Sequence, residues 1–188
     1  DLVVRSRDYH PVGHMSFAST HGMTAGVDIA VGTPINLKCL RPNSALISDA
    51  ACCLMSTADC GGAPCVLPSD PSANPACGQC SSDPSSCFDM AQAMWPDHCL
   101  QSGDSGFVSG VTYESTDVIM RKGSNPYVDA YSAFMDNTKS IYTPLHALLQ
   151  SHGITQLYIT GIATDFCVYW TATDGIDLGY SVTVIEDA

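Results

Sequence analysis

Charged residues are scarce in this sequence, and basic residues are the scarcest. Only 14% of the 188 residues are charged, and seven Lys and Arg stand against 19 Asp and Glu, so the formal net charge is -12. This balance disfavours nucleic acid and anionic membranes as partners, because both attract basic proteins. Long apolar runs are also lacking, and none approaches the roughly 20 residues of a membrane-spanning helix. A small molecule is therefore the better candidate ligand.

Hydrophobic residues make up 45% of the chain, which excludes a disordered protein. A chain of this length can bury one sizeable core, so residues 1–188 are predicted to form a single domain. The sequence starts at Asp1, without a methionine, and both of its ends are apolar strand-like segments. We therefore expect a fragment that is incomplete at both ends. No signal peptide is visible.

Strand-like and helix-like segments alternate in the C-terminal part. Strands are predicted at residues 2–8, 117–123, 155–162 and 180–188, and helices at 141–153 and 164–179. Leu145 and Leu149 lie at helical spacing, and Gly153 is a typical C-terminal cap. Strand, helix, strand, helix, strand predicts two βαβ crossovers, and hence an α/β fold with a mostly parallel sheet covered on both faces.

Ligands of such sheets bind at the carboxyl ends of the strands. Three loops at those ends carry chemically useful side chains: Asp8 and His10 follow the first strand, Lys122 follows the second, and residues 163–167 follow the third. The sequence therefore predicts a site there.

Residues 37–93 differ from the rest in composition. This segment holds eight of the ten cysteines among many Ser, Pro, Gly and Ala, namely Cys39, Cys52, Cys53, Cys60, Cys65, Cys77, Cys80 and Cys87. It shows no strand or helix period, so we interpret it as a loop-rich insertion. Disulfides are favoured over zinc sites, because histidines and regular Cys-x-x-Cys pairs are scarce here. Disulfides would indicate a secretory or extracellular location.

An aspartate and several histidines predict a metal site. Asp8 and His10 are two residues apart, and in an extended segment such positions face the same side. His98, in the stretch WPDHC (95–99), could add a third ligand from another loop. One carboxylate with two imidazoles suits zinc, iron or manganese and leaves a position for substrate or water. The alternative is an ordinary loop with solvated histidines.

Cys167 lies in the first turn of the predicted helix 164–179. The free N–H groups and the helix dipole favour a thiolate there, and Lys122 on a nearby strand would add a positive charge. These features predict a nucleophile. The alternative is a buried structural cysteine.

Four motifs together resemble the nicotinamidases (pyrazinamidases) of the isochorismatase-like cysteine hydrolase superfamily. The motifs are RDYHPVGHMSFAS, WPDHC, RKG…DAYSAF and GIATDFCVYWTATDG…LGYSVTVIEDA, and the match covers residues 1–20 and 94–188. The resemblance implies a three-layer α/β/α fold and a cytoplasmic enzyme. It also implies metal-dependent hydrolysis of nicotinamide to nicotinate and ammonia through a cysteine thioester, feeding NAD salvage.

The resemblance implies catalytic roles for individual residues. Cys167 would be the nucleophile and Lys122 the lysine of an Asp-Lys-Cys triad. The backbone N–H groups of Ala163 and Cys167 would form the oxyanion hole, with a cis peptide between Ile162 and Ala163. The triad aspartate belongs to a first strand that matches nothing here, so we expect it upstream of residue 1.

It implies binding roles as well. Asp8, His10 and His98 would hold one divalent metal ion, with His14 as an additional ligand, and zinc is favoured over iron or manganese. Trp95 and Tyr131 would form walls of the pyridine pocket.

Other functions stay open. They are another isochorismatase-like amidase, a non-catalytic relative that lacks the triad aspartate, and a disulfide-bonded extracellular interaction module built on residues 37–93. A homo-oligomer is also compatible with the sequence.

The cysteine-rich segment gives a first prediction. If disulfides cross-link residues 37–93, several of its cysteines should resist alkylation in the native protein until a reductant is added. Peptide mapping by mass spectrometry, with and without reduction, measures this protection. Immediate alkylation of all eight thiols in the folded protein would contradict both the disulfides and the secretory location.

Overall fold

The computed structural model describes residues 2–36, 91–103, 105–112, 114–126, 128–137, 139 and 141–187. The chain divides into two compact units: residues 1–9, 105–123 and 130–188 form the first, and residues 10–104 and 124–129 form the second. The eight cysteines of the predicted insertion lie outside the described residues, so their pairing stays a prediction. The single-domain interpretation also stays a prediction.

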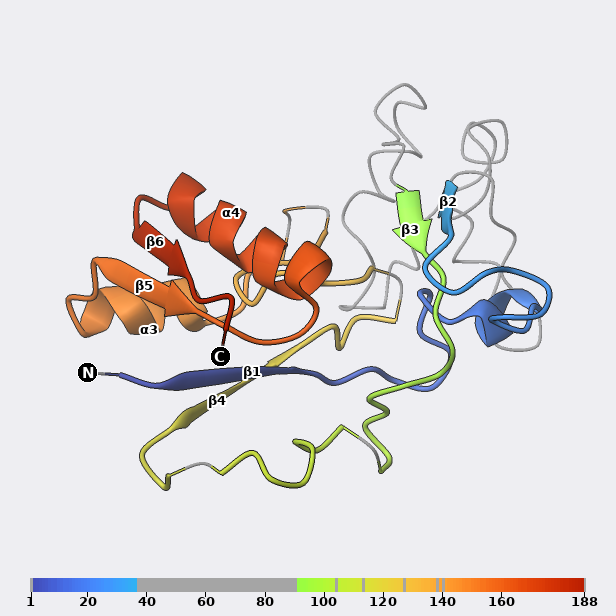
Figure 1. Cartoon of the computed structure of the whole chain (residues 1–188), viewed down its shortest axis with the longest axis horizontal. Coiled ribbons are helices and arrows are strands. Elements are labelled where there is room, and N and C mark those ends of the chain that lie inside the picture. The colour runs from blue at the N-terminus through green and yellow to red at the C-terminus, as the bar shows by residue number, and fades with distance from the viewer. Residues whose placement is uncertain are drawn as a thin grey trace, which may run out of the picture. The chain divides into compact units, whose positions relative to one another are not determined.

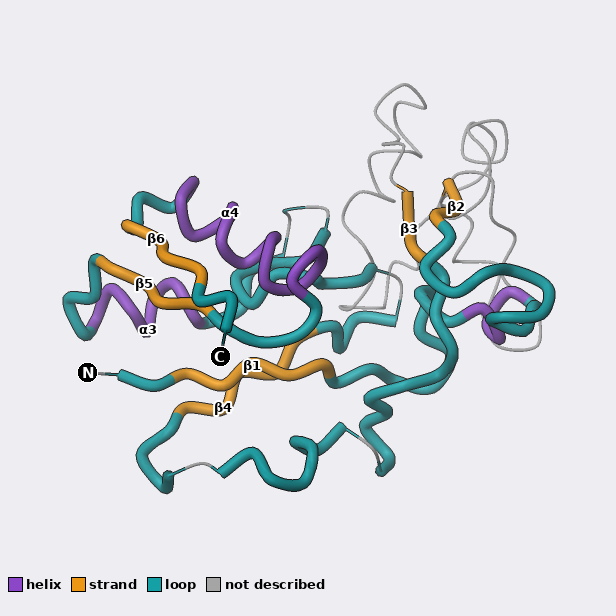
Figure 2. The backbone as a smooth tube through the Cα atoms, viewed as in Figure 1, coloured by secondary structure: helices purple, strands orange, loops and turns teal. Residues whose placement is uncertain are grey.

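The first unit has α/β architecture, as predicted. Its strands are β1 (Val4–Asp8), β4 (Val118–Lys122), β5 (Gln156–Ile159) and β6 (Ser181–Val184), and its α-helices are α3 (Leu145–Ser151) and α4 (Tyr169–Asp177). The strand β1 pairs with β4, and β5 pairs with β6, both in parallel (Figures 1 and 2). None of the described helices is long and apolar enough to cross a membrane.

Strand pairing differs from the predicted single sheet, because the described strands pair only in twos. The predicted crossover from β5 through α4 to β6 is present. Before it, residues 123–144 carry no regular strand or α-helix in the part that the structure describes, so the connection from β4 to β5 is longer than a simple crossover.

The second unit contains a short antiparallel pair that the sequence did not predict. It consists of β2 (Pro34–Asn36) and β3 (Ala91–Ala93). The last three residues of the predicted loop-rich insertion, 91–93, therefore form a strand.

The core of the first unit lies between the helices and the strands. It contains Met120, Phe134, Leu145, Leu149 and Tyr180, and the rings of Phe134 and Tyr180 stack with centroids 5.9 Å apart. The helix α4 packs closely on β5 and β6 at a glycine. A Cβ atom at Gly175 would lie only 3.1 Å from the side chain of Leu157, so a larger residue would push the helix away.

The predicted C-terminal ends of both helices are confirmed, but α3 starts at Leu145, later than the predicted residue 141, and the predicted helix 164–179 is α-helical only from Tyr169. The helix α3 follows Pro144, and the hydroxyl of Thr143 accepts the Leu145 N–H at 3.2 Å. The helix ends before Gly153, which has φ +65°. Gly179, at φ +92°, follows α4 in the same way. Glycine adopts this left-handed conformation without the steric cost that other residues incur.

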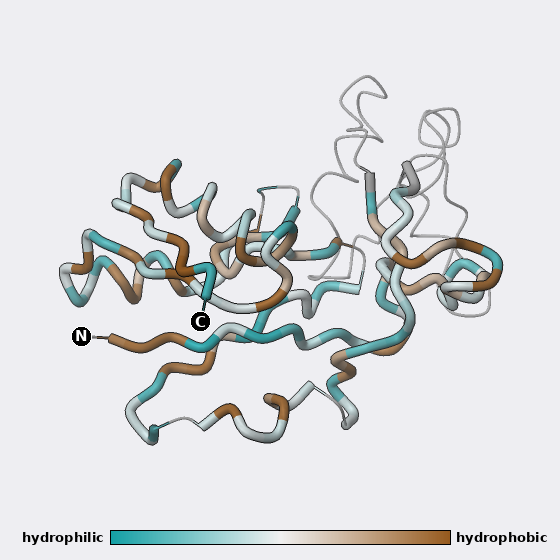
Figure 3. The backbone as a smooth tube through the Cα atoms, viewed as in Figure 1, coloured by the Kyte–Doolittle hydropathy of each residue, from teal (hydrophilic) through white to brown (hydrophobic). Residues whose placement is uncertain are grey.

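The two faces of the β1–β4 pair have opposite character. Met120 and Lys122 point to the buried face, whereas Ile119 and Arg121 are exposed, as strand alternation requires. The chain is hydrophobic where it enters β1 and hydrophilic toward Asp8 (Figure 3). Asp8 lies opposite Lys122 in the register of the pair. The strand ends therefore bring two opposite charges together.

An ion pair beside β1 gives a prediction of acid sensitivity. The Arg5 Nε donates to Asp117 Oδ2 at 2.6 Å, and this hydrogen bond is the main reason that the pKa of the Asp117 carboxyl is lowered. A lowered carboxyl pKa stabilises the fold above the unfolded-state pKa, and this stabilisation is lost as the pH falls through the folded-state pKa. Asp117→Asn should therefore lower the melting temperature slightly at pH 7.

The difference between Asp117→Asn and the wild type should vanish in acid, toward and below the folded-state pKa of Asp117. Thermal melts across that range measure it. The matched control is Asp177→Asn at the exposed end of α4, whose melting temperature should stay close to that of the wild type over the same pH range. A melting difference that is the same at every pH would contradict the assignment.

Candidate functional site

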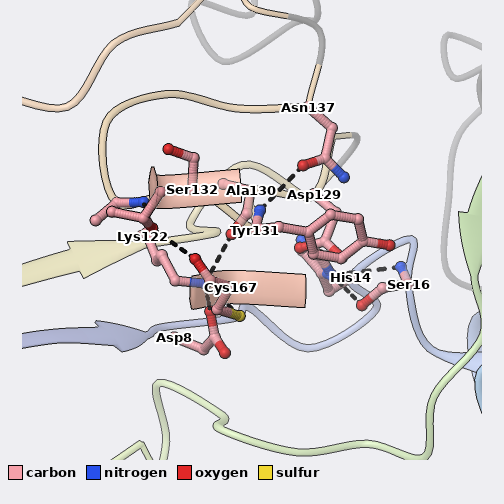
Figure 4. Close-up of polar contacts among 12 residues, drawn as sticks. Asp8, His14, Ser16, Lys122, Asp129, Ala130, Tyr131, Ser132, Asn137 and Cys167 are labelled. Carbon is pink, nitrogen blue, oxygen red and sulfur yellow. Dashed lines mark hydrogen bonds and ion pairs between the residues drawn. The ribbon is translucent and has the colours of Figure 1, made fainter. Parts of the chain in front are cut away.

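The thiol of Cys167 and the ammonium of Lys122 are in direct contact in the first unit. The Lys122 Nζ lies 3.4 Å from Cys167 Sγ, donates to the Ala130 carbonyl at 2.8 Å and forms an ion pair with Asp8 (Figure 4). Lys122 is only 5% exposed. A positive charge held this close to sulfur favours the thiolate over the thiol.

Three separate chain segments deliver these groups. Asp8 and Lys122 are the last residues of β1 and β4, and the parallel register sets them side by side. Cys167 comes from the turn after β5, in the π-helix Thr164–Val168 that leads into α4. The predicted meeting of the loops that follow the strands is therefore seen for Asp8, Lys122 and Cys167.

The backbone around Cys167 is unusual. The peptide between Ile162 and Ala163 is cis, as the resemblance implied. The Ala163 carbonyl accepts the N–H groups of Phe166 and Val168, at 3.2 and 3.1 Å, and the second bond closes a wide π-type turn. Such turns are frequent at functional sites. Ala163 and Cys167 are half-buried.

The stretch WPDHC lies along residues 10–18 in the second unit. The backbone of Trp95 forms two hydrogen bonds to this segment. Its N–H donates to the Ser16 carbonyl at 2.8 Å, and its carbonyl accepts the Ala18 N–H at 2.9 Å. At the other end, the His10 N–H donates to the Cys99 carbonyl at 3.0 Å. This pairing brings the His98 ring close to the His10 ring, with the two centroids 5.1 Å apart.

His98 has the tautomer that a metal ligand needs. Its Nδ1 lies 2.8 Å from the Pro96 carbonyl oxygen, which can only accept, so Nδ1 carries the proton. In a neutral imidazole with this proton, the lone pair is on Nε2. Among the predicted ligands, His10 and His98 come together in the second unit, whereas Asp8 ends β1 in the first unit, two residues before His10.

A second group of candidate ligands includes an acid that the sequence analysis missed. His10, His14 and Asp129 are all buried, and one ligand atom from each lies within 4.8 Å of the others. The Gln92 amide donates to Asp129 at 3.0 Å, and His14 Nδ1 lies 2.7 Å from the Ser16 hydroxyl. Asp129 belongs to the DAYSAF motif, but no local pattern distinguished it from an exposed acid.

The two predicted aromatic walls lie in different units. Tyr131, in the first unit, packs edge-on against Phe166 with centroids 5.3 Å apart. Trp95, in the second, lies over Gly32, where a Cβ atom would be 3.6 Å from the indole ring. Tyr131 therefore lies beside the turn that carries Cys167, and Trp95 shares a segment with His98.

The ion pair between Asp8 and Lys122 is a further feature that the sequence analysis missed. The sequence indicates Asp8 only as a metal ligand, and the acid partner of Lys122 is expected upstream of residue 1. The signal that could have found the pair is the strand register, since Asp8 and Lys122 each end a predicted parallel strand. The assignment of site residues to catalytic roles remains a prediction.

Comparison with known proteins points to nicotinamidases and their relatives. Residues 100–188 match the isochorismatase domain family. The nicotinamidase of Escherichia coli is 31% identical over 188 residues, which are all of this chain and 62% of that protein. The chain is thus similar to isochorismatase-like hydrolases.

Two further relatives are nicotinamidases. That of Acinetobacter baylyi is 42% identical over 98 residues, or 52% of this chain and 46% of that protein. The solved nicotinamidase/pyrazinamidase of Acinetobacter baumanii has a TM-score of 0.65 at 28% identity, covering 99% of this chain and 64% of that one. The chain thus spans less than two thirds of the length of these relatives.

Proposed function

We propose that this protein hydrolyses nicotinamide to nicotinate and ammonia through a thioester at Cys167, a reaction that serves NAD salvage. The observation that carries the proposal is the contact of Cys167 Sγ with the buried Lys122 ammonium, which is itself paired with Asp8. Similarity to a nicotinamidase along the whole chain supports the choice of substrate.

The first half of the reaction would form the acyl-enzyme. The Cys167 thiolate attacks the carboxamide carbon, and the carbonyl oxygen becomes an oxyanion. The backbone N–H groups of Ala163 and Cys167 would stabilise this charge. The tetrahedral adduct then collapses, the C–N bond breaks, and the Lys122 ammonium gives a proton to the leaving nitrogen, which departs as ammonia.

The second half would release nicotinate. A water molecule attacks the thioester carbon and transfers a proton to the Lys122 amine, so the ammonium is restored. The C–S bond breaks, nicotinic acid leaves and ionises to nicotinate in solution, and Cys167 returns as a thiolate beside the restored charge. Asp8 would hold Lys122 in place through both proton transfers, because the lysine needs a fixed partner whether it is an amine or an ammonium.

The histidines of the second unit fit a divalent metal ion. The lone pair of His98 Nε2 and the nearby imidazole of His10 are nitrogen ligands of the type that zinc prefers, with iron and manganese as alternatives. We propose Asp8 as the third ligand, since a carboxylate has a second oxygen besides the one paired with Lys122. When bound, the ion would orient the pyridine nitrogen or a water molecule.

Aromatic side chains would orient the flat substrate. Tyr131, packed on Phe166, and Trp95, packed on Gly32, are both held by neighbours, so each can offer a ring face at little entropic cost. The pyridine ring of nicotinamide suits such contacts. A cytoplasmic or secretory location and a homo-oligomeric state remain open predictions.

The nucleophile can be tested directly. Cys167→Ala should abolish ammonia release from nicotinamide, because no other thiol is placed beside Lys122 in the described part of the chain. Mass spectrometry of the wild type with substrate should show acylation on the peptide that contains Cys167. A Cys167→Ala variant that keeps full activity would disprove the thioester. A substrate panel of other carboxamides would reveal a different amidase.

Metal retention gives an independent test. His10→Ala should lose bound metal and most turnover, because removing one imidazole leaves too few ligands for tight binding. The matched control is His152→Ala at the exposed end of α3, which should retain both. Elemental analysis after dialysis measures the metal content. Full metal content in His10→Ala, or full activity of the metal-free wild type, would contradict the proposal.

A further inference from the structure

The hydroxyl of Thr171 joins the nucleophile to a distant segment of the first unit. Thr171 lies on α4, four residues after Cys167, and its hydroxyl donates to the Cys167 carbonyl at 2.6 Å. The same oxygen accepts the Ala133 N–H at 2.9 Å. Ala133 is 3% exposed, so its N–H group depends on a protein partner.

Residues 130–134 have no regular secondary structure and are held largely by side chains. A threonine binds each side of Ala133: Thr171 accepts its N–H, and the Thr143 hydroxyl donates to its carbonyl at 2.6 Å. Three residues earlier, the Ala130 carbonyl accepts the Lys122 ammonium at 2.8 Å. The position of Lys122 therefore depends on how this segment is fixed.

These contacts form a closed ring. From the Cys167 carbonyl the ring passes through the Thr171 hydroxyl to the Ala133 N–H, and then along the backbone to Ala130. It returns from the Ala130 carbonyl through Lys122 Nζ to Cys167 Sγ, over the 3.4 Å contact. The nucleophile and its activating charge are thus tied together twice, once by their own contact and once through Thr171.

We propose that Thr171 is a positioning residue that sets the distance between Lys122 and the Cys167 thiolate. The hydroxyl suits this task because it donates and accepts at once, so it can join a carbonyl to an N–H group. Valine has the same shape but can do neither, whereas serine can do both. The effect of Thr171 on turnover rests on the proposed function, but its effect on the thiol does not.

Thr173 provides a matched control on the same helix. Its hydroxyl makes the same type of bond, to the Tyr169 carbonyl at 3.0 Å, and no bond from it to another segment is seen in the described part of the chain. Thr173→Val therefore removes a helix-internal hydroxyl bond of the same kind without opening the ring. Any effect common to both valine variants reports on the helix alone.

The experiment measures the alkylation rate of Cys167 by iodoacetamide, followed by peptide mapping, together with kcat, KM and the melting temperature. Thr171→Val should slow alkylation of Cys167 and lower kcat by about tenfold or more with little change in KM, since a misplaced charge affects reaction more than binding. Thr171→Ser should restore most of both rates. Thr173→Val should behave like the wild type.

Each other outcome decides against the proposal. Unchanged alkylation and kcat in Thr171→Val, equal losses in both valine variants, or no recovery in Thr171→Ser would overturn it. If Thr171→Val does not fold, Thr171→Ala replaces it, and failure of both to fold while Thr173→Val folds would assign Thr171 a structural role only. If the wild type does not hydrolyse nicotinamide, the proposed function fails, and the alkylation rates alone decide the role of Thr171.

Discussion

The rest of the first unit is arranged around one buried charge, the ammonium of Lys122. A buried ammonium is costly unless its three N–H groups find partners. Here they find an ion pair with Asp8, the Ala130 carbonyl and the sulfur of Cys167, and each comes from a different segment. The charge therefore constrains a strand end, an irregular segment and a helix start at the same time. The contacts with Asp8 and Ala130 also hold the ammonium beside the sulfur, where its charge favours the thiolate.

Much of the fold was predictable because its signals are local. Apolar runs mark β1, β4, β5 and β6, leucine spacing marks α3, and Gly153 and Gly179 mark the ends of helices, since left-handed backbone favours glycine. The position of Cys167 at a helix start follows from the same local pattern. The pairing of strands in twos did not follow, because pairing depends on contacts between segments far apart in the sequence.

The candidate site was predicted residue by residue but not contact by contact. Sequence spacing and family resemblance pointed to Asp8, Lys122 and Cys167, yet the Asp8–Lys122 ion pair is visible only once two parallel strands are in register. Asp129 and Thr171 were missed for a related reason. An aspartate in a loop and a threonine in a helix are ordinary residues, and only burial beside histidines or a bond across the fold distinguishes them.

The residues proposed for catalysis and most of those proposed for metal binding lie in different units. Lys122, Cys167 and Ala163 lie in the first unit and within residues 100–188, which match the isochorismatase domain. The histidines His10, His14 and His98 lie in the second unit and outside that match. The family match therefore covers the thiol and its charge, whereas the similarity to the nicotinamidase of Escherichia coli extends over the segments that carry the imidazoles as well. Asp8 pairs with Lys122 in the first unit and precedes His10 by two residues. It therefore lies in the sequence between the segment that pairs with Lys122 and the segment that carries the first histidine.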